Sequence, residues 1–178
     1  LNVPLEKMEE LLRKERTQGQ SAGPAPYSIQ RLSIIGTAQR GKAELTGRVE
    51  IIVRAEGWIA VPLRLDGAVM VKPPEYRGPG EHFIQASSQG RGYVAWLRGE
   101  KDQRHELTLH LLVPLKTMGR ETRLPLLAPR STVSELTLGV PMAGAVGRVS
   151  EGATLEEPKR GPDGVTRFTA RGIGGEFE

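Results

Sequence analysis

The sequence predicts an all-β protein, and three observations lead to this fold class. Apolar and polar side chains alternate over long stretches after residue 26, which places the apolar ones on one face of a strand. The 22 glycines and 13 prolines fall between these apolar runs, where turns belong. No helical pattern is interleaved with the runs. We therefore expect an antiparallel β-sandwich of about ten strands, preceded by one short N-terminal amphipathic helix, with a closed barrel as the alternative.

The predicted helix covers residues 4–16, PLEKMEELLRKER. Proline suits its first turn, and its acidic residues precede its basic ones, which matches the helix dipole. A narrow apolar stripe at helical spacing consists of Leu5, Met8, Leu11 and Leu12. A helix of this length is marginal in water on its own. It must therefore pack on its own sandwich, on a neighbouring domain or on a partner.

Residues 17–26, TQGQSAGPAP, have the composition of a flexible linker, because they are small, polar and contain proline. The predicted organisation is thus a helix over 1–16, a linker over 17–26 and a β-sandwich domain over 27–178. The chain starts at Leu1 instead of methionine, and its last residues, 175–178, resemble the start of a strand. We expect it to be a segment of a longer polypeptide.

The strongest strand signal lies in residues 43–71, AELTGRVEIIVRAEGWIAVPLRLDGAVMV. Apolar residues keep one parity from Ala43 to Ala55 and regain it from Ile59 to Leu65, after an interruption at Glu56 and Gly57. The pair Asp66-Gly67 then separates two apolar runs, which predicts a β-hairpin closed by a type I′ turn. This stretch is expected to form three consecutive strands joined by tight turns.

The remaining strands are shorter. The first, over 27–35, changes parity once, which indicates a β-bulge. An irregular loop is expected over 72–80, because two adjacent prolines cannot lie in a central strand. Further strands are predicted at 82–88, 92–98, 107–113, 124–127, 136–140 and 146–149, with a final hairpin over 154–170 that turns at 161–164.

Composition excludes several classes of function. The chain has no cysteine, so disulfides, thiolate chemistry and cysteine-bound zinc are impossible. No apolar run approaches the roughly 20 residues of a membrane-spanning helix. The net charge of +4 is dispersed along the chain, which argues against a nucleic-acid groove. We therefore expect neither membrane spanning nor nucleic-acid binding.

The three histidines are the first candidates for chemistry. His105 and His110 lie five apart on one predicted strand, hence on opposite faces, and cannot share a metal ion. His82 can meet either of them only through tertiary folding. Nucleophile elbow, P-loop and dinucleotide fingerprint are all missing from the sequence. We predict no catalytic residue, metal ligand or cofactor from these patterns, although a hydrolase with a carboxylate pair stays a second alternative.

Trp58, Tyr93 and Trp96 are the candidate ligand-binding residues, because exposed aromatic rings on a β-sandwich can stack on sugars. Trp96 shares parity with Val94 and opposes Tyr93. Either one of these two faces lies outside, or the sheet is buried on both sides. The other interpretation is that both tryptophans pack in the core or at its rim.

The phrases EGWIAVPLRLDGAV, GYVAWLRG, HELTLHLLVPL and SELTLGVP resemble uncharacterised β-sandwich modules of large bacterial cell-envelope or secreted proteins. The resemblance implies an envelope, periplasmic or secreted location. We expect a non-catalytic structural or protein-interaction module, a segment of a larger envelope or secreted protein, whose partners are other protein modules or a second copy. A carbohydrate-binding module that uses Trp58, Tyr93 or Trp96 is the alternative, with a glycan as its partner.

Overall fold

The computed structural model describes residues 25–87, 92–150 and 152–174, and every regular element in these ranges is a β-strand. The all-β prediction is therefore confirmed. The predicted helix lies outside the described residues, as does the linker up to residue 24. The strands are β1 (Tyr27–Gln39), β2 (Lys42–Val53), β3 (Gly57–Arg64), β4 (Val69–Met70), β5 (Glu75–Arg77), β6 (Glu81–Ala86), β7 (Tyr93–Gly99), β8 (Arg104–Pro114), β9 (Lys116–Met118), β10 (Glu121–Arg123), β11 (Val133–Val140), β12 (Thr154–Leu155), β13 (Lys159–Arg160) and β14 (Thr166–Arg171).

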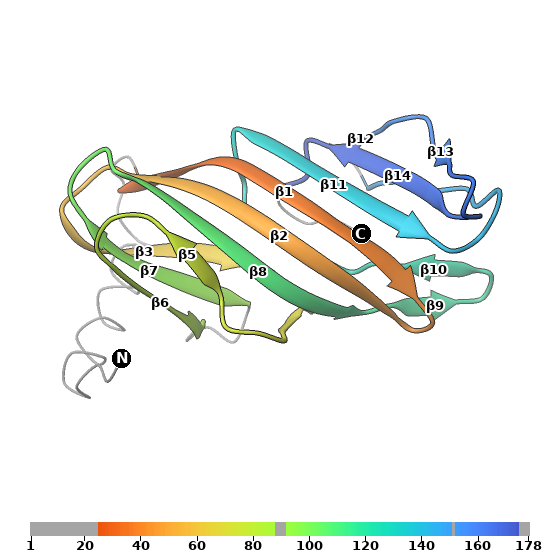
Figure 1. Cartoon of the computed structure of the whole chain (residues 1–178), viewed down its shortest axis with the longest axis horizontal. Helices are drawn as coiled ribbons and strands as arrows, with labels where there is room; N and C mark the ends of the chain where they lie inside the picture. The colour runs from red at the N-terminus through yellow and green to blue at the C-terminus, as the bar shows by residue number, and fades with distance from the viewer. Residues whose placement is uncertain (1–24, 88–91, 151, 175–178) are drawn as a thin grey trace.

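The strands form three sheets (Figure 1). The large sheet has nine strands; seven follow the order β12-β14-β11-β1-β2-β8-β4, while β13 pairs with β14 and β5 with β8. The small sheet has the order β3-β7-β6, and β9 pairs with β10 in a separate hairpin. The structure thus has more strands than predicted, because several pairings involve only two or three residues.

One pairing departs from the antiparallel prediction, since β1 and β11 run parallel. The chain reaches β11 through an irregular segment that passes the start of β1, where the Thr132 amide donates to the Ile29 carbonyl at 3.0 Å. Entry beside the beginning of β1 forces β11 to run in the same direction. A long connection of this kind is what a parallel pair requires.

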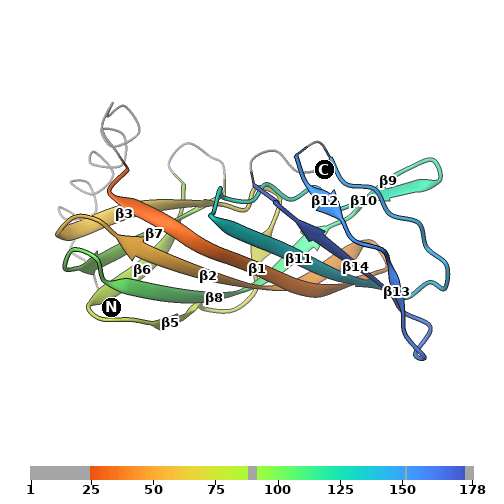
Figure 2. The same ribbon diagram turned by 90° about the horizontal axis from the view of Figure 1, so that it is seen from above.

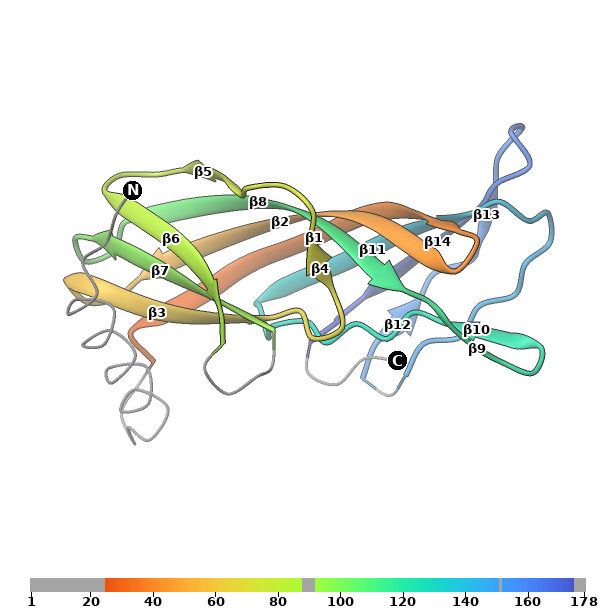
Figure 3. The ribbon, with the colours of Figure 1, turned by 90° about the horizontal axis from the view of Figure 1, so that it is seen from below.

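The small sheet faces one half of the large sheet, and Figures 2 and 3 show it as a second layer there. The main core is one apolar cluster that contains inward-facing residues of both sheets, such as Ile51 and Leu109 of the large sheet and Val61 and Leu97 of the small sheet. Irregular segments contribute Leu126, Ala128 and Ile173 to the same cluster. The core is therefore filled by packing of the two sheets together with irregular segments of the chain.

The central stretch crosses between the sheets twice. It enters as β2 of the large sheet, continues as β3 of the small sheet and returns as β4 to the edge of β8. The predicted Asp66-Gly67 hairpin is therefore wrong, because β3 and β4 do not pair. Arg64 and Leu65 have φ angles of 57° and 63°, which turns the chain out of β3. The Leu65 amide then donates to the Leu127 carbonyl at 2.7 Å.

Other local predictions have mixed outcomes. The bulge in the first strand is confirmed, since the β1–β2 register shifts between Ile29 and Arg31. The final hairpin is confirmed as β13–β14. Residues 124–127 and 146–149 are not strands, and Leu126 is buried within irregular backbone. In the described part of the chain there is no helix with the length and apolar character to cross a bilayer.

Candidate functional site

Three aromatic rings from three strands meet where the chain passes from the large sheet to the small one. We call Tyr76, His82 and His105 the ring cluster. The Tyr76 hydroxyl lies 2.8 Å from Nδ1 of His105. The Tyr76 ring stacks on His82, with centroids 3.9 Å apart and planes 20° apart, and its centroid lies 5.9 Å from that of His105. The cluster thus connects β5, β6 and β8.

The backbone explains how Tyr76 reaches this position. β5 is a three-residue strand whose Tyr76 is the register partner of Leu107 on β8. Prolines precede β5 and a Gly-Pro-Gly sequence follows it, so the chain can leave β8 at once on both sides. The Tyr76 hydroxyl donates to the Pro79 carbonyl at 2.5 Å, which closes the following turn. Tyr76 therefore holds the connection between β5 and β6 against β8.

The hydrogen bonds define the tautomer of His105. A phenol has one hydrogen, and Tyr76 gives it to Pro79. Nδ1 of His105 must then carry a hydrogen and donate to the Tyr76 oxygen, which leaves Nε2 as an unprotonated acceptor. His105 is fully buried, and Nε2 has no hydrogen-bond partner among the residues that the structure describes.

Gly99 borders this nitrogen. A Cβ at Gly99 would lie 3.2 Å from Nε2 of His105 and 2.4 Å from the Gln103 side-chain oxygen. The glycine therefore lets the backbone of β7 pass close to the imidazole edge. Gly78 has the same role on the other side, where a Cβ would lie 2.9 Å from the Tyr76 hydroxyl. Both glycines allow the ring cluster to pack densely.

Burial determines the charge states of the cluster. Desolvation lowers the pKa of His105 and of His82, and it raises the pKa of Tyr76. All three rings are therefore neutral at pH 7. Ion pairs also occur on these strands and their neighbours: Arg48 contacts Glu106 on the outer face of the large sheet, and Glu81 contacts Arg98 on the small sheet.

The prediction that His105 and His110 lie on opposite faces of one strand is confirmed. His110 lies on the outer face of β8, where Nε2 is 3.4 Å from Oε1 of Glu75, whereas His105 points into the core. No set of three or more His, Cys, Asp or Glu side chains within the described ranges could hold a metal ion. Sequence reasoning did not connect His82 with His105, because Tyr76, the residue between them, lies in a stretch that reads as an irregular loop.

The three aromatic residues proposed for sugar stacking do not form one surface. Trp58 and Trp96 both approach Phe83, with centroid distances of 5.3 and 6.0 Å. Tyr93 lies apart from them, and its hydroxyl accepts from the Met70 amide at 3.1 Å and donates to the Ala68 carbonyl at 3.3 Å. Trp96 is fully buried. Glycan binding by these residues stays an untested prediction.

Comparison with known proteins identifies likeness only at the level of structure. No family model matches the chain, and no curated protein matches its sequence. The M1 zinc metallopeptidase from Deinococcus radiodurans is similar over 85% of this chain and 40% of its own, with 12% identity and a TM-score of 0.48. Native leukotriene A4 hydrolase from Saccharomyces cerevisiae is similar over 96% of this chain and 33% of its own, with 9% identity and a TM-score of 0.48.

A two-domain M1 zinc metallopeptidase bound to L-arginine is similar at the same low level of identity and TM-score. The chain spans less than half of the length of each of these proteins. The finding contradicts our expectation of a non-catalytic structural or interaction module of an envelope protein, because the similar structures are peptidases and a hydrolase. The expectation rested on strand-and-turn phrases, and such phrases specify a fold more than a function. At this identity and TM-score no activity or residue role passes to this chain.

Proposed function

We propose that the chain is a proton-responsive β domain, in which the ring cluster holds the β5–β6 connection at neutral pH and releases it in acid. One observation carries the proposal: His105 is fully buried, bonded through Nδ1 to Tyr76, and has no described partner for Nε2. A buried imidazole with an unpaired acceptor nitrogen can bind a proton at that nitrogen. The resulting cation costs free energy in the closed state, because no water solvates it there.

Proton uptake at Nε2 converts His105 into a buried cation with a donor that lacks an acceptor. The ring escapes this cost by reaching water, which requires that Tyr76 and its strand move away from β8. β5 can move readily, because it pairs with β8 over only three residues and has proline and glycine at its ends. His82 stacks on the other face of Tyr76, so its own protonation acts in the same direction.

The sign of the pH effect follows from the lowered pKa values of His105 and His82. An exposed histidine titrates near pH 6.5, whereas the buried forms titrate lower. Between these values the open state binds more protons than the closed state, so acid favours opening. The closed connection is most stable above about pH 6.5, and for the fully buried His105 it loses up to ~1.4 kcal/mol per pH unit as the pH falls towards the lowered pKa; the half-buried His82 contributes less, because water screens its charge.

The envelope, periplasmic or secreted location belongs to this proposal, because such compartments experience the pH of the surroundings. The resemblance of the strand phrases to bacterial envelope modules supports this location.

Loss of β5 also uncovers part of the edge of β8, and an uncovered strand edge can pair with a further strand. A strand of another protein module or of a second copy is the partner that fits this edge.

Hydrogen exchange of the amides at residues 75–78, measured against pH and corrected for intrinsic rates, tests the proposal. Protection should fall progressively below pH 6.5 in the wild-type chain, by at most about tenfold per pH unit for His105, while the β1–β2 ladder keeps its protection. The substitution His105→Gln should flatten this dependence, whereas His110→Gln, which removes the outer-face contact with Glu75 of β5, should leave the loss of protection in acid in place. A His105 ring that titrates at pH 6.5 or above by NMR, or an unchanged pH dependence in His105→Gln, would overturn it.

A further inference from the structure

The outer face of the small sheet is apolar and enclosed, although no second sheet covers it among the residues described. Its central side chains are Ala60, Val94 and Trp96, which are 4%, 2% and 0% exposed. They form a cluster separate from the main core, because they point away from the large sheet while Val61, Ala95 and Leu97 point towards it. The small sheet is therefore buried on both faces.

The neighbours that the structure describes do not account for this burial. Among the apolar side chains of the described ranges, Trp58 and Phe83 pack against the cluster, and both are half-buried members of the same sheet. Side chains of one sheet stand roughly perpendicular to it, so neighbours flank a tryptophan ring but do not cap it. Nε1 of Trp96 also has no hydrogen-bond partner in the described part of the chain. A further segment must lie over Trp96.

We infer that the amphipathic segment 4–16 of the same chain docks on this face. Its apolar stripe, Leu5, Met8, Leu11 and Leu12, offers the long unbranched and γ-branched side chains that fit around a tryptophan ring. A helix of this length needs an apolar surface to be stable, and the outer face of the small sheet needs a cover. Docking therefore gives the helix its apolar surface and gives the outer face of the small sheet its cover.

The entry of the chain places this segment within reach. The Arg54 amide donates to the Pro26 carbonyl at 2.6 Å, and Tyr27 is the register partner of Val53, so the chain joins the large sheet beside the β2–β3 turn. β3 begins at Gly57, three residues after Arg54, and Trp58 is its second residue. The start of the described chain thus lies next to the edge strand of the small sheet.

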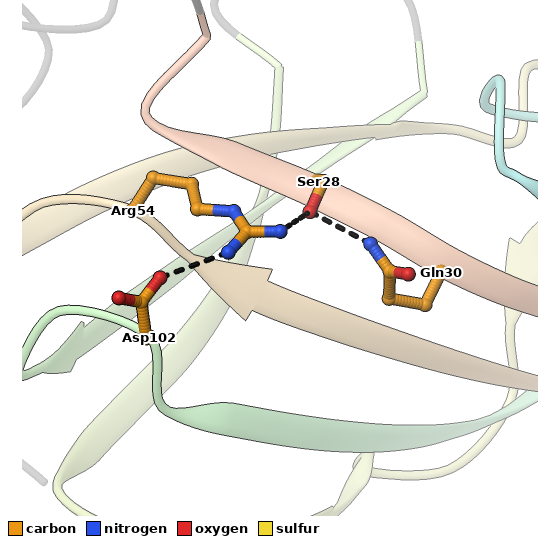
Figure 4. A network of polar contacts seen from close by, with 4 residues as sticks. All are labelled: Ser28, Gln30, Arg54 and Asp102. Carbon is orange, nitrogen blue, oxygen red and sulfur yellow. Dashed lines mark hydrogen bonds and ion pairs between the residues drawn. The ribbon is translucent and has the colours of Figure 1, made fainter.

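A polar network strengthens this anchor (Figure 4). The Arg54 guanidinium donates to Asp102 at 2.8 Å and to the Ser28 hydroxyl at 3.4 Å, and Gln30 donates to Ser28 at 2.8 Å. The network connects the start of β1 to the β2–β3 and β7–β8 turns. Residues 17–25 can extend about 30 Å from this point, and a three-stranded sheet is only about 10 Å wide between its outer strands.

Photo-crosslinking in the full chain tests the occupant directly. A benzoylphenylalanine at Phe83, beside Trp96, should form an intramolecular adduct with a residue of segment 4–16, identified by peptide mapping of a mixture of isotopically light and heavy chains. Mixed light–heavy adducts would assign the face to a second copy and overturn the inference. Adducts confined to residues 25–174 would overturn it as well, because the domain would then cover this face by itself.

Fluorescence provides a second measurement that does not depend on crosslinking. In a Trp58→Phe background, Trp96 is the only tryptophan of the chain. Its acrylamide quenching constant should rise at least threefold with Met8→Ala/Leu12→Ala, and it should stay unchanged with the matched control Lys7→Ala/Lys14→Ala. Equal quenching in both double variants, at protein concentrations where the chain is monomeric, would contradict the docking.

Discussion

The Tyr76 hydroxyl lies 2.8 Å from Nδ1 of His105 and connects a three-residue strand to an eleven-residue one. The same hydroxyl donates to Pro79, so one phenol serves both as the latch of β5 and as the closure of the turn after it. A change at one residue of the ring cluster therefore alters how the whole β5–β6 connection is attached to β8.

The substitution Tyr76→Phe should lower the free energy of unfolding at pH 7.5 by about 1–3 kcal/mol, because it leaves the buried Nδ1–H of His105 without an acceptor. Urea denaturation measures the loss. A double-mutant cycle with His105→Leu supplies the control, since Tyr76→Phe should cost much less once the imidazole is gone. Additive losses in the cycle would show that the hydrogen bond does not couple the two residues.

Alkaline pH should destabilise the chain through two half-buried tyrosines. Burial raises the pKa of Tyr76 and of Tyr27 above the value near 10 of an exposed tyrosine. The unfolded chain therefore loses these protons first, so the contribution to stability is complete below about pH 10 and is lost as the pH rises through the folded pKa. Urea denaturation between pH 9 and 11 should show a smaller decline in Tyr76→Phe than in the wild type; an identical decline would contradict the effect of burial on Tyr76.

Two glycines on paired strands should respond oppositely to alanine. A Cβ at Gly36 would lie 2.1 Å from the Glu44 carbonyl oxygen and 2.9 Å from the Leu45 Cα, and backbone atoms cannot move aside. Gly36→Ala should therefore destabilise by about 3 kcal/mol. A Cβ at Gly47 would meet nothing closer than 3.9 Å, so Gly47→Ala should change stability by less than about 1 kcal/mol, on the stabilising side. Thermal denaturation of both variants checks the contrast.

Adjacent leucines of β8 should show which face is the core. Leu111 is 2% exposed within the main core, whereas Leu112 lies half-buried on the opposite face. Leu111→Ala should cost about 2–5 kcal/mol, because a cavity remains in a core packed from two sheets. Leu112→Ala should cost about 1 kcal/mol or less. Comparable losses in urea denaturation would mean that the outer face of the large sheet is covered.

The alternation of side chains predicts most strands well, because burial on one face produces the same period of two in sequence and structure. β2 and β8 show this with strictly alternating burial over most of their length. Alternation says nothing about which strands pair. The Asp66-Gly67 turn therefore looked like a hairpin, although the positive φ angles at Arg64 and Leu65 send the chain to another sheet.

The candidate site was less predictable for a physical reason. The sequence placed His105 and His110 on opposite faces of one strand, but Tyr76, the partner of His105, pairs with β8 over a strand too short to produce a pattern. Likewise, the parity of Trp96 and Val94 left open whether the small sheet is buried on both sides. Only the three-dimensional positions of Ala60, Val94 and Trp96 answer that question.

The parallel pairing of β1 with β11 has a consequence for the order of folding events. Arg31 lies opposite Val133, about a hundred residues further along the chain, and β1 stands between β11 and β2 in the middle of the large sheet. During synthesis, one edge of β1 therefore stays open until residues 133–140 have left the ribosome. Translation speed and chaperone access over this interval should therefore affect the yield of folded protein. Their effect on the yield should exceed the effect of the finished domain's stability.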